Sequence, residues 1–396
     1  MSLRVTPFHA RTAALCQSQA WRRWAGYVAA SSYELHHERE YHSIRNSAAL
    51  LDVSPLYKYL VTGPDAARLL DRVVTRDVAR LDKHQVLYTT WCDSTGKVID
   101  DGTISRLDDH EYRMTSADPG LRWLADNAFG MDVNITDVSD AIAALALQGP
   151  LSRVILEQLT QTDLSQLGYF RLTHVTARGM PVTISRTGYT GDLGYEIWLR
   201  PEYALPLWDA LIEVGTSYGI TPTGLLALDL ARIEAGLMLI DVDYVSARRA
   251  LITGQTSSPF ELNLGWTVRL EKERFVGREA LAAEHARGAA WQFIGVEVQW
   301  DSLERLYAEV GLPPRLPTAA WRTSVPLYVD GAQVGYATSG CWSPLLKKYI
   351  ALGHVSSSHA SPGTRLEMEI TVEHHRKRAE ARVVKTPFFN PARKRA

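Results

Sequence analysis

A glycine-rich stretch, Arg186–Trp198, carries the side chains best suited to hold a planar ligand. Three of its glycines recur at every third position, which predicts a tight turn that leads into a strand: Gly188, Gly191 and Gly194. The ring of Tyr189 could lie flat under a ligand, and Glu196 could accept two hydrogen bonds from an amidine-like edge. The alternative interpretation is a hairpin with a solvated acid.

Two adjacent acids, Asp100 and Asp101, form the second candidate group. They lie just beyond the turn of a predicted hairpin, in which the β-rich runs 86–92 and 97–105 bracket a glycine-containing turn. Because adjacent side chains of a strand face opposite sides, only one of the two acids is expected to point at a given cavity. The pair therefore predicts no carboxylate dyad, and the alternative interpretation is a solvated strand end.

Metal and disulfide chemistry is poorly supported. The neighbouring His36 and His37 point in different directions on either a helix or a strand, so a solvated helical face is expected at 36–40. The three cysteines lie far apart and form no Cys-x-x-Cys pair: Cys16, Cys92 and Cys341. We expect buried or incidental thiols and no metal.

The composition predicts a globular body with locally chosen ligands. At 396 residues, the chain is expected to divide into two or three domains. A hydrophobic content of 46%, a charged content of 22% and a net charge of −1 argue against disorder and against a general nucleic-acid surface. No signal-peptide core and no apolar run of about 20 residues is present, so a cytoplasmic protein without a membrane segment is expected.

The order of the elements predicts an α+β fold. A strand closed by Gly-Pro and followed by a helix occurs at 59–70 and again at 144–159, and helices are expected at 206–217 and 224–239. On the last helix Arg232 could be held by Asp229, three residues earlier. A surface loop is expected at residues 244–257. Six β runs then predict a small antiparallel barrel or sandwich: 293–298, 325–329, 333–338, 350–355, 365–370 and 381–385.

Ten motifs, read in order over nearly the whole chain, resemble the glycine-cleavage T-protein (aminomethyltransferase) family, which includes folate-dependent demethylases. No single motif is decisive, but ten collinear matches make chance resemblance remote. They are Leu51-Asp-Val-Ser54, Tyr59-Leu-Val-Thr-Gly-Pro64, Gly96-Lys-Val-Ile-Asp-Asp101, Leu147-Gln-Gly-Pro150, Arg186-Thr-Gly-Tyr-Thr-Gly191 with Gly194-Tyr-Glu196, Arg232-Ile-Glu-Ala-Gly236, Pro259-Phe-Glu261, Phe275-Val-Gly-Arg-Glu-Ala-Leu281, Thr338-Ser-Gly340 with Ser343-Pro344, and Pro387-Phe388.

The resemblance implies a three-domain cloverleaf around a central tetrahydrofolate site, with a C-terminal β-barrel as the third leaf. The implied first α+β domain is discontinuous. The limits are 1–50 plus 140–250 for the first domain, 51–139 for the second, 251–290 for a connecting segment and 291–396 for the barrel.

The resemblance also implies roles for individual residues. Asp101 falls on the family's catalytic aspartate, and Glu196 falls on the carboxylate that binds the pterin edge. Tyr88 and Tyr189 fall on aromatic positions that line the ring, and Arg232 is expected to contribute to folate binding. A carboxylate near a reacting nitrogen can accept its proton or stabilise the charged amine.

The chain departs from the family where the second substrate is expected, and the folate-binding turn is kept. Pro55-Leu-Tyr57 replaces His-Met-Gly, Leu228 replaces an arginine, Asp241 replaces a glycine, and Ser116-Ala-Asp118 replaces Asn-Ala-x-Asn. The 244–257 loop is also longer than usual. We therefore expect Tyr57, Asp118 and Asp241 to contact the donor.

Three functions remain open at this stage. The favoured one is a tetrahydrofolate-dependent demethylase that moves a methyl group from a small methylated donor to tetrahydrofolate. The first alternative is the aminomethyltransferase of glycine cleavage, which acts on an aminomethyl group bound to a lipoyl carrier protein. The second is a non-catalytic folate-binding assembly or maintenance factor, against which the retained Asp101 argues.

Overall fold

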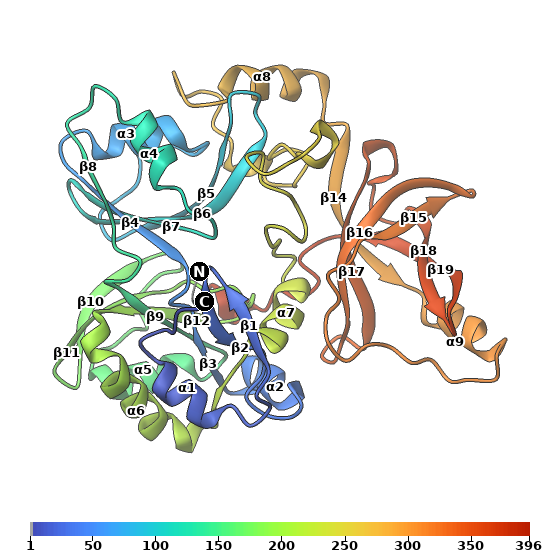
Figure 1. Ribbon diagram of the computed structural model, residues 1–396, viewed down its shortest axis with the longest axis horizontal. Helices are drawn as coiled ribbons and strands as arrows, with labels where there is room; N and C mark the ends of the chain where they lie inside the picture. The colour runs from blue at the N-terminus through green and yellow to red at the C-terminus, as the bar shows by residue number, and fades with distance from the viewer. Residues whose placement is uncertain (1–2) are drawn as a thin grey trace.

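Figure 1 shows the chain as three bodies in the computed structural model, which describes residues 3–396. Two bodies that combine helices with a sheet lie one above the other, and a barrel of strands stands beside them. The predicted α+β fold with a C-terminal antiparallel barrel is confirmed. The proposed domain limits stay a prediction.

The first sheet has six strands in the order β10-β11-β12-β9-β3-β13, antiparallel except for the β13–β3 pair. Helices α1, α5 and α6 cover its outer face, where Phe8, Trp208 and the strand residue Tyr195 share one hydrophobic core. The central strand β9 is buried along its whole length. The helices cover one face, and a second hydrophobic cluster, which includes Ala144 and Ala146, covers the other. The strands are β3 (Ala48–Asp52), β9 (Ala143–Gln148), β10 (Leu172–Ala177), β11 (Met180–Ser185), β12 (Gly194–Leu199) and β13 (Ile220–Pro222).

The helices and turns of this body lie close to their predicted places. The prediction of a solvated helical face at 36–40 is wrong at Glu40 of helix α2. Glu40 is 0% exposed and accepts hydrogen bonds from three backbone amides. The elements are α1 (His9–Leu15), the hairpin β1 (Trp21–Trp24) and β2 (Tyr27–Ala30), α2 (Glu38–Asn46), α5 (Ser152–Thr160), η1 (Pro201–Tyr203), α6 (Ala204–Gly215), η2 (Thr216–Tyr218) and α7 (Leu225–Glu234).

The second sheet has five strands in the order β5-β6-β7-β4-β8 and carries helices α3 and α4 on one face. The apolar residues of that face, among them Ile104 and Met114, alternate with polar residues on the other face. The elements are β4 (Tyr57–Thr62), α3 (Ala66–Val73), β5 (Val86–Cys92), β6 (Val98–Asp108), β7 (Glu111–Ser116), α4 (Leu121–Asn127) and β8 (Asn134–Asp137).

The third body is a closed barrel of six strands in the order β14-β17-β16-β15-β18-β19, and all six predicted β runs lie in it. The segment before it packs on the second sheet, where Leu281 of α8 contacts the Gly96 turn of the β5–β6 hairpin. The elements are η3 (Thr253–Gln255), η4 (Gly265–Thr267), α8 (Arg278–Arg287), β14 (Trp291–Val298), α9 (Trp300–Ala308), β15 (Val325–Val329), β16 (Ala332–Ser343), β17 (Lys348–Ser356), η5 (Ser357–His359), β18 (Arg365–Val372), β19 (His375–Val384) and η6 (Ala392–Lys394).

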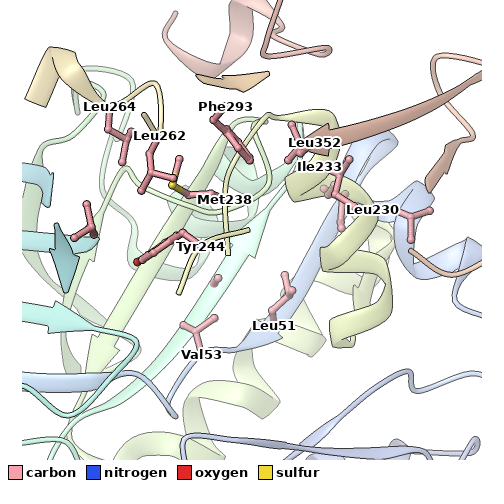
Figure 2. Packing of buried hydrophobic residues seen from close by; sticks show 14 of the residues in the cluster. Leu51, Val53, Leu230, Ile233, Met238, Tyr244, Leu262, Leu264, Phe293 and Leu352 are labelled. Atoms are coloured by element: carbon pink, nitrogen blue, oxygen red, sulfur yellow. The ribbon is translucent and has the colours of Figure 1, made fainter. Parts of the chain in front are cut away.

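One hydrophobic cluster joins the three bodies (Figure 2). Leu51 comes from the first sheet, Ile233 from α7, Leu262 from the connecting segment and Leu352 from the barrel. Tyr244 lies among them and is 3% exposed, so the prediction of a surface loop from residue 244 is wrong at its first residue. The loop becomes exposed only further on, where Leu251 is 89% exposed.

The segment after the barrel returns to the first body (Figure 1). The amide of Phe389 donates to the carbonyl of Glu234 at the end of α7. Arg393 forms an ion pair with Asp192, whose side chain is 0% exposed, at 2.7 Å. The basic residues 393–395 near the C-terminus therefore include one that forms an ion pair with a buried acid.

Candidate functional site

The polar face of the second sheet and the inner face of the first sheet lie against each other. Asp101, Thr103 and Arg113 share the face of the second sheet that is opposite to α3 and α4. The guanidinium carbon of Arg113 lies 4.0 Å from the ring centre of Trp198, which is on β12 of the first sheet. Polar side chains of the second sheet therefore face the first sheet, and the candidate site residues are sought between the two sheets.

The glycine-rich turn before β12 is shaped by one side chain, Gln148. A Cβ at Gly188 would lie 2.0 Å from a Gln148 side-chain atom, and a Cβ at Gly194 would lie 2.3 Å from one. Gln148 also donates to the carbonyls of Thr187 and Tyr195. Both glycines are thus required for the close packing of Gln148 against the turn. This packing fixes the start of β12, in which Glu196 lies two residues after Gly194.

Glu196 lies on β12 and points toward the second sheet. Its Oε2 accepts a hydrogen bond of 2.6 Å from Thr187, and its Oε1 accepts none from residues 3–396. Burial raises the pKa of this carboxyl, while the Thr187 hydroxyl and the charge of Arg113 oppose the rise. Glu196 is thus partly buried, which differs from the alternative of a fully solvated acid, and its Oε1 remains available to a hydrogen-bond donor.

Asp101 is held by two phenols. Tyr88 donates to Oδ2 at 2.8 Å, and Tyr244 donates to Oδ1 at 2.5 Å. Burial raises the pKa of Asp101, and both hydrogen bonds oppose the rise because they stabilise the carboxylate. A partly buried carboxyl whose orientation is fixed and whose pKa is raised is suited to accept a proton.

Asp100 departs from the strand-alternation prediction. It is 1% exposed, its Oδ2 accepts from the amide of Asp118 at 3.0 Å, and its Oδ1 lies 3.4 Å from the Tyr244 hydroxyl. Both acids thus reach the same phenol, because the β5–β6 register shifts beside Trp91 and the Asp100 side chain turns back onto the main chain. Burial, followed by the charge of Asp101, raises the Asp100 pKa well above its usual range.

Tyr189 and Arg232 occupy different environments. The Tyr189 hydroxyl donates to the carbonyl of Met238, and the charge of Asp101 contributes to its raised pKa after burial. Arg232 is 0% exposed and is paired with Asp243 at 2.5 Å and with Asp229 at 3.5 Å. The predicted pairing with Asp229 is confirmed, whereas a contact of Arg232 with folate stays a prediction.

Two of the three residues predicted to contact the donor lie together at an exposed rim. Arg249, from the long loop, lies 2.7 Å from Asp118 and 2.7 Å from Asp241. Asp241 has a φ of +64°, in the region that glycine adopts most easily. Tyr57 instead packs against the core of the second sheet.

The sequence reasoning missed Tyr244 and Trp266. Tyr244 lies 143 residues from the acid it contacts, so no local pattern could reveal it. The Trp266 ring stacks on that of Tyr88 with centroids 6.0 Å apart, and Trp266 is 54% exposed. The signal available in the sequence was a tryptophan that directly follows a glycine, Gly265-Trp266.

Residues 3–396 contain no group of His, Cys, Asp and Glu suited to hold a metal ion, and none of their helices combines the length and apolar character that a membrane span requires. All three cysteines are free and buried, as expected. The side chains that meet between the two sheets carry carboxylates, phenols and a guanidinium group.

Comparison with known proteins adds two family matches. The GCVT N-terminal domain family matches residues 6–272, and the glycine cleavage T-protein C-terminal barrel domain family matches residues 310–390. The crystal structure of glycine cleavage system aminomethyltransferase T from Bartonella henselae has the same fold, with a TM-score of 0.83, 24% identity, and 98% of this chain and 99% of that chain covered.

Curated relatives carry one name. A protein named aminomethyltransferase from Halothermothrix orenii is 36% identical over 356 residues, which cover 88% of this chain and 90% of that protein. Another from Desulfitobacterium hafniense is 34% identical over 354 residues, which cover 88% and 89%. A third, from Moorella thermoacetica, is 35% identical over 359 residues, which cover 90% of each chain.

Proposed function

The chain belongs to the glycine-cleavage T-protein (aminomethyltransferase) family, and on this premise we propose that it transfers the carbon of a lipoyl-bound aminomethyl group to tetrahydrofolate. It is a tetrahydrofolate-dependent transferase. The preference for a demethylase gives way to its first alternative, because relatives that share about a third of its residues over most of their length are named aminomethyltransferases. The partner under this proposal is a lipoyl carrier protein.

The observation that carries the proposal is the partly buried carboxylate of Asp101, fixed by two phenols. A protein that only bound folate would have no use for an acid held in this way, whereas a transferase requires a group that takes up or stabilises a proton. Tyr88 and Tyr244 fix the direction of both carboxylate oxygens.

The residues present fit a reduced folate. Glu196 is partly buried and has one carboxylate oxygen without a partner in residues 3–396, which suits the amidine-like edge of a pterin. Tetrahydrofolate supplies the N5 and N10 nitrogens that bond the transferred carbon. Asp101 supplies a negative charge and a proton acceptor, and the hydrophobic cluster around Tyr244 excludes water. Holding two substrates together contributes roughly 7–11 kcal/mol to such catalysis.

The test is identification of the folate product by chromatography. With tetrahydrofolate and aminomethyl-loaded lipoyl carrier protein, we expect 5,10-methylenetetrahydrofolate and ammonia. Asp101→Asn serves as the inactive control. Absence of product with the loaded carrier, in a protein that binds tetrahydrofolate, would refute the proposal.

A second candidate is transfer of a methyl group from a small methylated donor to tetrahydrofolate. The rim of the site favours this candidate, because three departures from the family lie together there. Arg249 of the long loop forms ion pairs with Asp118 and with Asp241. Because donor specificity changes when the contacts to the donor change, such a cluster fits an altered donor. Formation of 5-methyltetrahydrofolate from a methylated small molecule without any carrier would establish this candidate.

A further inference from the structure

One buried cation of the second sheet lacks a partner. Arg113 of β7 is 3% exposed, and its guanidinium carbon lies 4.0 Å from the ring centre of Trp198. Its Nε is buried without a hydrogen-bond acceptor among residues 3–396, and no carboxylate of this range forms an ion pair with it. Because a buried charge without a partner is costly, the fold alone does not account for an arginine at this position.

The groups around Arg113 do not compensate its charge. Burial lowers the pKa of Arg113 to about 10, and the charge of Glu196 opposes this fall. The nearby Lys58 is a second cation, whose Nζ donates to three backbone carbonyls. Burial, followed by the charge of Arg113, lowers the pKa of Lys58 to about 8. Within the described part of the chain, Glu196 is thus the one carboxylate that acts on Arg113.

Glu196 and Arg113 carry opposite charges on the facing surfaces of the two sheets, but they do not pair. Glu196 precedes Trp198 by two residues on β12, so the two side chains share the face toward Arg113, about 7 Å apart along the strand. A carboxylate in contact with a guanidinium commonly accepts two parallel hydrogen bonds. Here Oε1 of Glu196 and Nε of Arg113 both lack a partner in residues 3–396. An open acceptor and an open donor therefore adjoin the same place between the sheets.

We propose that Arg113 is a specificity-determining residue, which donates to the C4 carbonyl oxygen of the pterin ring while Glu196 accepts from the amidine-like edge beside it. The inference rests on the proposed use of tetrahydrofolate and adds a second reading group to it. The pterin presents two donors, the 2-amino group and N3–H, directly next to the carbonyl acceptor at C4. A carboxylate and a guanidinium that do not pair with each other match this order of donors and acceptor. A pterin with an amino group at C4 would instead turn a donor toward the guanidinium.

The experiment compares the Kd of tetrahydrofolate with that of its 4-amino analogue, in which an amino group replaces the C4 carbonyl, by titration calorimetry. The unaltered protein should bind tetrahydrofolate about 10–150-fold more tightly, because the analogue loses a hydrogen bond from a charged donor. Arg113→Met has no donor, so it should bind tetrahydrofolate more weakly and reduce the preference to less than about threefold. The same variant should raise the Tm of the folate-free protein, because an unpaired buried charge is removed.

Arg178→Met is the matched control, because the Arg178 side chain, in the turn between β10 and β11, is 44% exposed and pairs with Glu213 at 2.6 Å. It should keep the full preference, and Arg113→Lys, which retains a charged donor, should keep part of it. Equal affinity of the unaltered protein for both ligands, or a preference that survives in Arg113→Met, would overturn the inference and leave the proposed function intact. So would an Arg113→Met protein that does not fold or has a lower Tm, because the guanidinium would then serve the fold. Failure of the unaltered protein to bind either ligand would overturn both.

Discussion

Glu196 and Asp101 are both partly buried carboxylates whose pKa is raised by burial, yet their oxygens have different partners. Asp101 accepts a phenol hydrogen bond on each oxygen. Glu196 accepts one from Thr187 and keeps Oε1 without a partner in residues 3–396. This difference fits the proposed roles, in which Asp101 acts on protons and Glu196 keeps acceptor capacity for a ligand.

The largest expected effect comes from Asp101→Asn, which tests the proton-handling end. Shape is retained while the charge and basicity are lost, so turnover should fall by about 10²–10⁴-fold with little change in the Kd for tetrahydrofolate. Single-turnover kinetics and calorimetry measure the two quantities. Asp108→Asn, on the same strand with a side chain that is 59% exposed, is the control. A parallel loss of affinity would assign Asp101 to binding.

The next effect is that of Glu196→Ala, which tests the binding end. The pterin donors would lose a buried acceptor, at roughly 1–3 kcal/mol for each unsatisfied group, so the Kd should rise about 5–150-fold. Titration calorimetry with tetrahydrofolate measures it, with Glu202→Ala, whose side chain is 52% exposed, as the control. Unchanged affinity would remove Glu196 from the site.

Tyr244→Phe tests how one of the two phenols affects the pKa of Asp101. The phenol stabilises the ionised form of Asp101, so its loss raises the Asp101 pKa further above the ordinary range. Activity requires the ionised form, and the acid limb of kcat/KM should therefore move to higher pH, by about 1–2 units for a hydrogen bond to a charged group. The limb reports Asp100 and Asp101 together. A shift to lower pH would contradict the assigned direction of this hydrogen bond.

The smallest effect is expected at the rim, with Arg249→Gln. Its side chain is 44% exposed, and exposed ion pairs contribute about 0.2–1 kcal/mol, so kcat/KM for the donor should change by less than about fivefold. The Kd for tetrahydrofolate should stay constant. A large change in folate affinity would place Arg249 at the folate-binding end.

The sequence patterns that depend on near neighbours predicted the structure well. Alternation and glycine positions were enough to predict the six β runs of the barrel, the hairpin that carries Asp101 and the turn before Glu196. Contacts between distant segments were not predictable in this way. Tyr244 reaches Asp101 only because the three bodies share a core, and the carboxylate of Asp100 reaches Tyr244 only because of an irregular register. Alternation describes a regular strand, and the site lies where the strand is irregular.

The ion pair between Asp192 and Arg393 has a consequence for synthesis of the chain. The two residues are 201 positions apart, so at roughly 5–20 residues per second the ribosome adds Arg393 some tens of seconds after Asp192. Until then Asp192, 0% exposed in the finished fold, has Arg45 at 3.5 Å as its partner. Arg393 can therefore pair with Asp192 only after the barrel has been synthesised. Until then the carboxylate of Asp192 lacks one of the two arginines that surround it in the finished protein.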